Sequence, residues 1–257
     1  MEYLNYIVEE GVAIATINRP PANALSRALI EEVDQLLDAV EKDVDVRVVL
    51  LHGEGRFFSA GADIKEFTEV SSEKEFAKLS THGQDVFERL EKFSKPVIAA
   101  IHGAALGGGL ELAMSCHFRY VSETAKLGLP ELQLGLIPGF GGTQRLPRYV
   151  GVAKAAEMMF TSDPISGVDA VKWGLANLAI PEESLLQESL KTAKKIAKKS
   201  PIALKTAIEM LQFSKTNSFY DGISAEAERF GTVFVTEDAK EGITAFIEKR
   251  QPVFKGQ

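Results

Sequence analysis

Two glutamates lie in stretches where most neighbouring residues are apolar. Glu111 stands between two leucines in HGAALGGGLELA (102–113), and Glu131 lies in LGLPELQLGLIPG (127–139). Taking a carboxylate out of water disfavours its charged form and raises its pKa. Carboxyl groups with raised pKa values exchange protons near neutral pH, so the pair is a candidate for general acid and base catalysis.

Each glutamate also has a simpler explanation. Glu111 suits the first turn of a helix, where the helix dipole favours an acid, and Glu131 suits a solvent-exposed turn after Pro130. Taken singly, these explanations are as good as a catalytic one. A site becomes the better interpretation when the loops around the glutamates are considered.

Loops of small residues follow two apolar segments. The segments 46–53 and 97–101 are typical of buried strands, and they lead into FFSAGADIKEF (57–67) and into 102–113. Small residues let a backbone turn sharply and approach a ligand. A helix that begins in such a loop has N–H groups free to bind an anion or an oxyanion. One such loop indicates a tight turn, whereas two matched loops favour a site with paired donors.

Other catalytic and binding motifs do not fit. The chain has no GxxxxGK[ST], and neither 107–112 nor GFGGTQ (139–144) completes GxGxxG. Ser59 lies in FSAGA rather than GxSxG, and the four histidines lack metal-ligand spacing. The sequence therefore predicts no nucleotide-phosphate loop, no serine nucleophile and no metal site.

Composition sets the class of protein. The 257 residues are 45% hydrophobic, enough for one large domain with or without an appendage. A net charge of -7 argues against nucleic acid or an anionic membrane as the main partner, and a single cysteine excludes a disulfide framework. The first residues do not have the pattern of a secretory signal, and no apolar run is long enough to span a membrane. We expect a cytoplasmic protein.

Strand-like segments dominate the first part of the chain and helical periodicity the last. A hairpin is expected over 4–18, and a helix capped by Ser26 follows it. We divide the chain into a core domain, 1–183, and a helical region, 184–257. The other expected elements are a helix over 73–93, a strand over 117–123, and helices over 142–151, 152–160, 184–199, 201–216, about 222–233, and 237–249.

Two features near the C-terminus have alternative interpretations. The helix over 190–200 places five lysines on one face, which is typical of a solvated surface; an RNA-binding patch is the less favoured alternative because the chain is acidic. Phe246 and Lys249 lie one turn apart, where a ring and a cation can hold an adenine and a phosphate. Packing of the apolar stripe that contains Phe246 is the simpler interpretation.

Four segments together resemble one family. SAGADIKEF, HGAALGGGLELA, PELQLGLIPGFGGTQRLPR and AFIEKR occur in the order found in the enoyl-CoA hydratase/isomerase, or crotonase, family, and the similarity is greatest to its hydratases. The likeness covers essentially the whole chain. It implies an α/β fold, a spiral of repeated ββα units followed by a helical trimerisation region. It also implies a homo-hexamer built as a dimer of trimers.

The resemblance also implies a set of site residues. The backbone amides of Ala62 and Gly108 match an oxyanion hole, Glu111 and Glu131 match the catalytic pair, and Gly139 matches a position near the catalytic water. Phe246 and Lys249 match residues that reach coenzyme A, often from a neighbouring subunit. Positions that match the lining of the CoA and acyl site are Ala24, Ala60, Asp63, Ile64, Leu106 and Pro130.

The implied reaction is syn addition of water to a trans-2-enoyl-CoA, giving the 3-hydroxyacyl-CoA, as in fatty-acid β-oxidation. Glu111 is expected to act as base towards water and Glu131 to protonate the α-carbon, although the reverse assignment stays open. No metal or redox cofactor is expected, because coenzyme A is part of the substrate. The alternatives are a Δ3,Δ2-enoyl-CoA isomerase or a hydratase of a branched substrate such as methylglutaconyl-CoA. Residues 66–82 are expected to shape the acyl end, without fixing its length.

Overall fold

A computed structural model describes residues 1–68, 72–216 and 218–257, and its centre is a six-stranded sheet. Strands β1 (Leu4–Glu9) and β2 (Val12–Ile17) form the predicted antiparallel hairpin. The sheet continues in parallel through β3 (Val48–Gly53), β4 (Val97–Ile101), β6 (Phe118–Ser122) and β9 (Leu178–Ile180). The parallel strands are buried on both faces, which is why their sequences read as continuous apolar runs.

A second, three-stranded sheet lies beyond the ends of β3 and β4. It consists of β5 (Ala104–Leu106), β7 (Lys126–Gly128) and β8 (Ile165–Ser166). Single bridges fasten the loop 57–67 into this layer: Ser59 pairs with Ala105, and Ala62 pairs with Leu25. The second sheet therefore brings together the two small-residue loops that follow β3 and β4.

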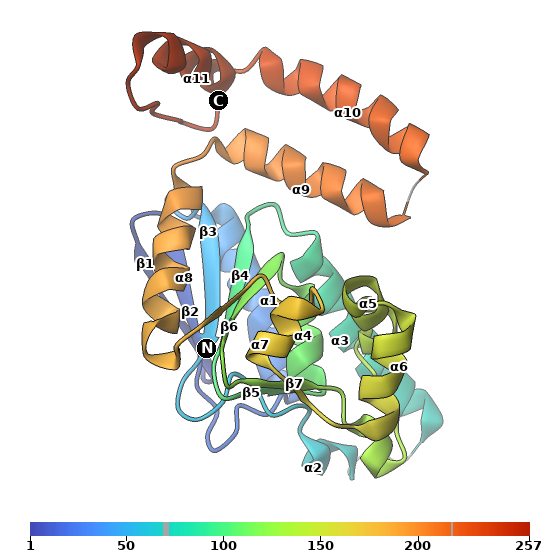
Figure 1. The fold of residues 1–257 in the computed structure, drawn as a ribbon. Helices are drawn as coiled ribbons and strands as arrows, with labels where there is room; N and C mark the ends of the chain where they lie inside the picture. The colour runs from blue at the N-terminus through green and yellow to red at the C-terminus, as the bar shows by residue number, and fades with distance from the viewer. Residues whose placement is uncertain (69–71, 217) are drawn as a thin grey trace.

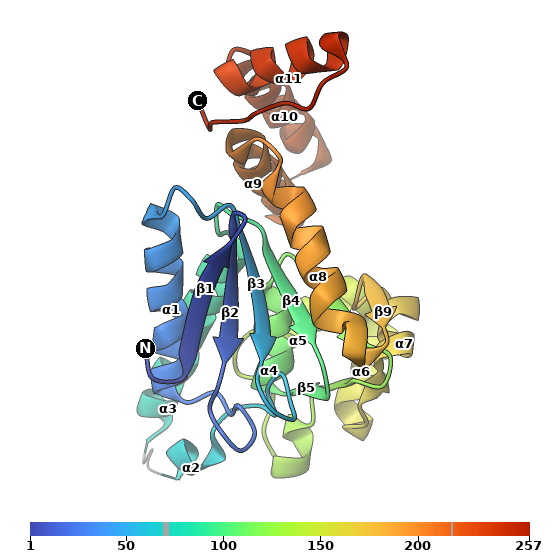
Figure 2. The same ribbon diagram turned by 90° about the vertical axis from the view of Figure 1, so that its left-hand side faces the viewer.

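Helices cover both faces of the large sheet, as Figure 2 shows. On β3, Val49 and Leu51 join one core with α1 (Arg27–Lys42), α3 (Glu73–Glu91) and α4 (Gly108–Ser115). Val48 and Leu50 point the other way, into a smaller core with α8 (Glu182–Ala197). This alternation follows from the two-residue period of a strand. The remaining short elements are α2 (Ile64–Phe67), the 3₁₀ turn η1 (Glu131–Leu134), α5 (Gly142–Val150), α6 (Val152–Thr161) and α7 (Gly167–Lys172).

Three helices project beyond the sheet: α9 (Pro201–Thr216), α10 (Phe219–Phe234) and α11 (Glu237–Glu248) (Figure 1). The predicted helical character of the C-terminal region is confirmed. Within that region, however, α8 packs against the sheet, whereas α9, α10 and α11 extend away from it. The division between residues 183 and 184 stays a prediction.

The local expectations for the first helix and for α10 can be compared with the structure. Ser26 caps α1 as predicted, since its hydroxyl oxygen accepts a hydrogen bond from the Leu29 N–H at 3.2 Å. Helix α10 starts earlier than expected because Ser218 caps it, accepting from the Asp221 N–H. Among the described residues, none of the helices combines the length and the apolar character needed to cross a membrane.

Candidate active site

A cavity of about 750 Å³ opens where the two small-residue loops meet α3, η1 and the start of α5. Both glutamates singled out from the sequence line it, together with backbone from both loops. The other predicted residues in its wall are Ala60, Ala62, Ile64, Gly108, Pro130 and Gly139. The cavity thus gathers predicted residues that lie up to 79 positions apart in the chain, from Ala60 to Gly139.

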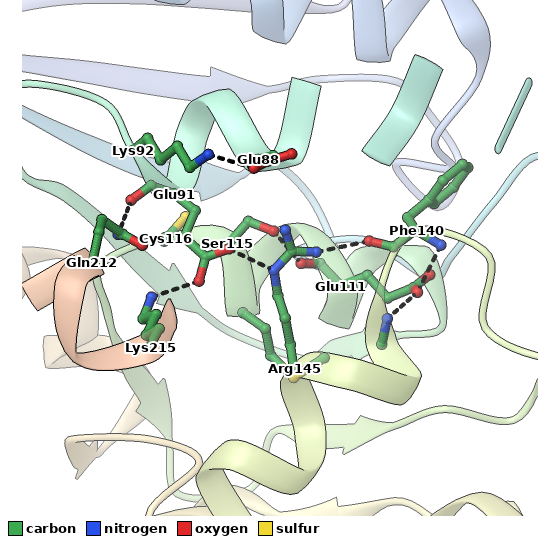
Figure 3. A network of polar contacts seen from close by, with 12 residues as sticks. Glu88, Glu91, Lys92, Glu111, Ser115, Cys116, Phe140, Arg145, Gln212 and Lys215 are labelled. Carbon is green, nitrogen blue, oxygen red and sulfur yellow. Dashed lines mark hydrogen bonds and ion pairs between the residues drawn. The ribbon is translucent and has the colours of Figure 1, made fainter. Parts of the chain in front are cut away.

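Glu111 lies in the first turn of α4 and is almost fully buried, with 1% of its surface exposed. Its Oε1 accepts hydrogen bonds from the Phe140 N–H at 2.8 Å and from the Gly142 N–H at 2.7 Å (Figure 3). Burial raises the pKa of Glu111 to about 7; the Gly142 N–H opposes this shift, and the nearby Glu131 adds to it. A carboxyl group with this pKa can take up or release a proton near neutral pH.

Glu131 opens the η1 turn after Pro130 and directs one side-chain oxygen into a dry environment. Its Oε2 is buried and has no hydrogen-bond partner among the described groups. Burial raises the pKa of Glu131 above its ordinary value. The turn after Pro130 is solvent-exposed, as the alternative expected, since Leu132 and Leu134 are exposed, but Glu131 itself is half-buried.

Two backbone N–H groups are left free at the cavity wall. Around Ala62, the bridge uses the Leu25 N–H to the Gly61 carbonyl and the Asp63 N–H to the Leu25 carbonyl. The Ala62 N–H takes no part in it. Gly108 begins α4, so its N–H has no acceptor within the helix. In the part of the chain that the structure describes, neither N–H donates to another protein group.

The glycines of these loops allow the two backbones to meet. Gly61 has φ +113°, and a β-carbon there would lie 3.1 Å from the Leu106 carbonyl oxygen. Gly107, with φ +51°, follows β5 and is the N-cap residue of α4. A side chain at either position would strain the backbone and push the loops apart. The glycine run noted in the sequence therefore serves a close approach of two chain segments.

Three of the predicted lining residues, Ala24, Asp63 and Leu106, are not among the residues that line the cavity. Arg19 links two of them, donating to the Ala24 carbonyl at 3.0 Å and pairing with the Asp63 carboxylate at 2.6 Å. Asp63 also caps α2, and Leu106 lies in β5 with its N–H bound to the Ser59 carbonyl. The sequence interpretation did not single out Arg19, which lies between the expected hairpin and the first helix.

Phe246 and Lys249 are far from the cavity within this chain. They lie at the end of α11, and Figure 1 shows α11 and α2 at opposite ends of the molecule. Phe246 is 86% exposed, and neither residue lines the cavity. A contact of these residues with a ligand in the cavity would therefore need a second copy of the chain.

Helix α3 supplies a wall that sequence reasoning did not assign residue by residue. Ala77, Leu79, Ser80 and Gln84 line the cavity, so part of the stretch 66–82 forms one of its walls. Residues 69–71 of that stretch are outside the described residues. The sequence of α3 gave little indication of a functional role, because packing of an amphipathic helix is enough to explain its helical periodicity.

The positive charge on the lysine-rich face of α8 is partly neutralised by nearby acids. Ala193 and Ala197 are buried, as its periodicity predicted. Lys194 pairs with Glu10 at 2.8 Å and with Glu9. These acids reduce the positive potential of the face, which agrees with the solvated-surface interpretation.

Comparisons with known proteins show what this fold and cavity belong to. The sequence pattern of the enoyl-CoA hydratase/isomerase family matches residues 8–257. A Bacillus subtilis protein named "Probable enoyl-CoA hydratase" is 54% identical over the full length of both chains. A Clostridium acetobutylicum protein named short-chain-enoyl-CoA hydratase is 44% identical over 98% of this chain and 97% of its own. The crystal structure of an enoyl-CoA hydratase from Bacillus anthracis has a TM-score of 0.94 at 38% identity, covering 99% of this chain and all of the other. The chain belongs to the enoyl-CoA hydratase/isomerase family, and its fold is the family's spiral.

Proposed function

We propose that the chain catalyses syn addition of water to a trans-2-enoyl-CoA, as a hydro-lyase of the enoyl-CoA hydratase type. The observation that carries the proposal is that two glutamates with raised pKa values and two unpaired backbone N–H groups line one cavity. Hydration needs a base for water, an acid for the α-carbon and donors for an enolate oxygen. This set of groups provides all three.

The donors stabilise the charge that develops during the reaction. When water adds to the β-carbon of the conjugated thioester, negative charge moves to the carbonyl oxygen. In the proposed complex, the N–H groups of Ala62 and Gly108 bind that oxygen. They are fixed by the bridge to Leu25 and by the start of α4, so little reorganisation is needed.

The glutamates move the protons. Glu111, held by two N–H groups through Oε1, takes a proton from the water, which adds to the β-carbon as hydroxide. Glu131, whose buried Oε2 has no hydrogen-bond partner among the described residues, gives its proton to the α-carbon. Gly139 lines the cavity beside the N–H of Phe140, next to the proposed position of the water. The reaction as proposed uses neither a metal nor a redox cofactor, and coenzyme A arrives as part of the substrate.

A kinetic comparison tests the activity. Loss of the conjugated-thioester absorbance of crotonyl-CoA reports hydration directly. We expect Glu111→Gln and Glu131→Gln each to lower kcat by about 10²–10⁴-fold, as for loss of a general acid or base. Glu157→Gln, on the exposed face of α6, is the control and should keep wild-type turnover. Isomerisation of a 3-enoyl-CoA without hydration of crotonyl-CoA would assign the isomerase reaction instead.

The substrate range is proposed to begin with short, unbranched acyl chains. Two relatives, at 44% and 43% identity, are named short-chain-enoyl-CoA hydratase and crotonyl-CoA hydratase. A third, at 40% identity, is named 2,3-dehydroadipyl-CoA hydratase, so a longer acyl group also fits within the family. A panel of 2-enoyl-CoAs of increasing length, with methylglutaconyl-CoA as the branched member, tests this ranking.

The assembly is proposed to be a homo-hexamer, a dimer of trimers, formed through the projecting helices. These helices expose large apolar side chains, which is unusual for a surface in water. They are Leu211, Phe219, Tyr220, Ile223, Phe230, Phe234, Val235, Ile243, Phe246 and Ile247. Light scattering measures the mass directly, and a monomer at micromolar concentration would contradict the proposal.

Coenzyme A is proposed to contact Phe246 and Lys249 from a neighbouring subunit. Their exposure at the end of α11, distant from this chain's own cavity, supports such an arrangement. Phe246→Ala and Lys249→Ala should then raise KM for crotonyl-CoA more than they lower kcat. A cytoplasmic location is part of the proposal, whereas RNA binding by the lysine face of α8 is the less favoured alternative.

A further inference from the structure

The segment 139–142, which binds the Glu111 carboxylate, is itself held by another layer of side chains. Three consecutive peptide groups are involved. The first provides the Phe140 N–H and the third provides the Gly142 N–H, and both N–H groups donate to Oε1 of Glu111. The middle peptide presents the Phe140 carbonyl, which points away from Glu111 and accepts from Arg145 (Figure 3).

Arg145 binds that middle peptide with one arm of its guanidinium group. Its Nη1 donates to the Phe140 carbonyl at 2.8 Å, while its Nε donates to Glu91 at 3.0 Å. The side chain of Arg145 is 10% exposed and that of Glu91 is 13% exposed, so water competes little for either. A β-carbon on Gly141 would lie 2.5 Å from Nη1, which shows how closely the guanidinium is seated against the turn.

Helix α3 holds the first peptide of the segment as well. The Gly139 carbonyl accepts from the Ser80 hydroxyl at 2.5 Å and from the Gln84 amide at 2.8 Å. That carbonyl shares its peptide with the Phe140 N–H, so each bond polarises the other. Helix α3 therefore holds two consecutive carbonyls. It binds that of Gly139 directly, and it holds that of Phe140 through Glu91 and Arg145.

The projecting helix α9 fixes Glu91 from the other side. Lys215 pairs with Glu91 at 2.5 Å, and Gln212 donates to the Glu91 carbonyl at 2.6 Å. Burial alone would raise the pKa of Glu91, but Lys215 and Arg145 outweigh it and keep the group ionised. The anion that holds Arg145 is thus present throughout the neutral range.

We propose that Arg145 and Glu91 are positioning residues for the proposed base: they fix the 139–142 segment so that two N–H groups converge on one oxygen of Glu111. The inference rests on the proposed hydratase function. Neither residue lines the cavity, so neither touches the substrate. Their contribution is to hold one carboxylate in a reactive orientation, and outer residues of this kind typically change activity by about 10–100-fold.

The charged groups around Glu111 give the proposal a second readout. The charges that act on it are Glu131, which raises its pKa, and Arg145, which lowers it. Loss of the Arg145 cation should therefore move the acidic limb of the pH profile to higher pH. A merely structural role would lower the amount of folded enzyme without moving that limb.

The experiment compares four variants of the full-length chain with crotonyl-CoA across pH. We expect Arg145→Gln to lower kcat by about 10–100-fold with little change in KM, and to shift the acidic limb of kcat/KM upward. Arg145→Lys keeps the positive charge but cannot bind the Phe140 carbonyl and Glu91 through two separate nitrogens. The acidic limb of its pH profile should therefore stay where it is in the wild type, while kcat should fall. Glu91→Gln should lower kcat, and adding it to Arg145→Gln should have no further effect, because the two act in series.

The matched control is Arg89→Gln, on the same helix as Glu91. Arg89 pairs with Asp34 and Asp38, both at 2.6 Å, and does not line the cavity. It should keep the wild-type kcat and pH profile. The inference would be overturned by a folded Arg145→Gln enzyme that has the wild-type kcat and an unchanged acidic limb of its pH profile. If Arg145→Gln does not fold, a wild-type kcat in Glu91→Gln would overturn the inference instead. Failure of the wild-type enzyme to hydrate any 2-enoyl-CoA would instead overturn the proposed function.

Discussion

A β-carbon placed on Gly107 would lie 2.9 Å from Oε1 of Glu131. The glycine that turns the chain from β5 into α4 therefore also leaves the space in which the second acid sits. Its φ of +51° is a backbone conformation that other residues adopt only under strain. One residue thus meets two requirements, a backbone turn and room for a carboxylate.

This contact predicts the effect of Gly107→Ala. The added methyl group must displace Glu131, so kcat should fall by about 10²-fold, the scale of a misplaced catalytic group. Gly55→Ala is the control: Gly55 also has a positive φ, +76°, but nothing lies within 4 Å of its β-carbon position. Both variants should lose stability, and equal kcat values in the two would refute the link to Glu131.

The pH dependence of hydration should show Glu111 as the base. Because burial raises the pKa of Glu111 to about 7, most of this carboxyl is protonated below that pH and cannot accept the proton from water. We expect kcat/KM to rise with pH through about 7, as Glu111 loses its proton. The residual activity of Glu111→Gln should lack the rising limb; persistence of the limb would assign it to another group.

The same burial predicts that Glu111→Gln stabilises the fold at alkaline pH. The folded state holds a proton on Glu111 up to about pH 7, whereas the unfolded chain releases it near the ordinary value of 4.5. Stability from this group is therefore present below pH 4.5 and is lost as pH rises through about 7. Glutamine keeps the accepting oxygen without the charge, so we expect a gain of about 1–3 kcal/mol at pH 8.

Urea unfolding at pH 4.5 and pH 8 measures this change. The advantage of Glu111→Gln over wild type should appear at the higher pH and shrink at the lower one. Glu157→Gln, an exposed acid on α6, serves as the control and should show no such difference. Equal gains at both pH values would contradict the assigned cause.

Arg119 is predicted to stabilise the end of α4 opposite to Glu111. It is 2% exposed, and its guanidinium donates to the carbonyls of Leu175 at 2.7 Å and of Ala113 and Cys116 at 3.1 Å. It also lies 4.3 Å from the ring centre of Tyr149. Arg119→Met leaves the Leu175 and Cys116 carbonyls without these donors, while the Ala113 carbonyl keeps the Cys116 N–H, and it should cost about 3 kcal/mol.

Chemical unfolding followed by circular dichroism checks the Arg119 prediction. Turnover per folded molecule should stay near wild type, because the cavity lies at the other end of the helix. Arg148→Met, on the exposed face of α5, is the control and should change stability by less than about 0.5 kcal/mol. A loss of similar size in both variants would show that the buried carbonyls are not the cause.

The sequence by itself determined the local elements and the chemical types at the site. The hairpin, the capped first helix and the buried strands follow from periodicity and capping, which depend on neighbouring residues only. Glu111 and Glu131 could be selected because a carboxylate that is buried among apolar residues is costly, and both lie in apolar stretches. The family resemblance added the roles of backbone groups such as Ala62 and Gly108, which no side-chain pattern reveals.

Only the tertiary structure decided which groups face one another. The short strands of the second sheet bring the two loops together, yet a three-residue strand such as β5 carries too little pattern to be predicted. Arg145 and Glu91 lie 54 positions apart, on helices whose periodicity is explained by packing. Their contact with each other, and the hydrogen bond from Arg145 to the Phe140 carbonyl, therefore could not be predicted from the sequence. The position of Phe246, at the end of the molecule away from the cavity, is likewise set by the path of α9 to α11. Long-range packing, rather than local propensity, fixes where a helix lies.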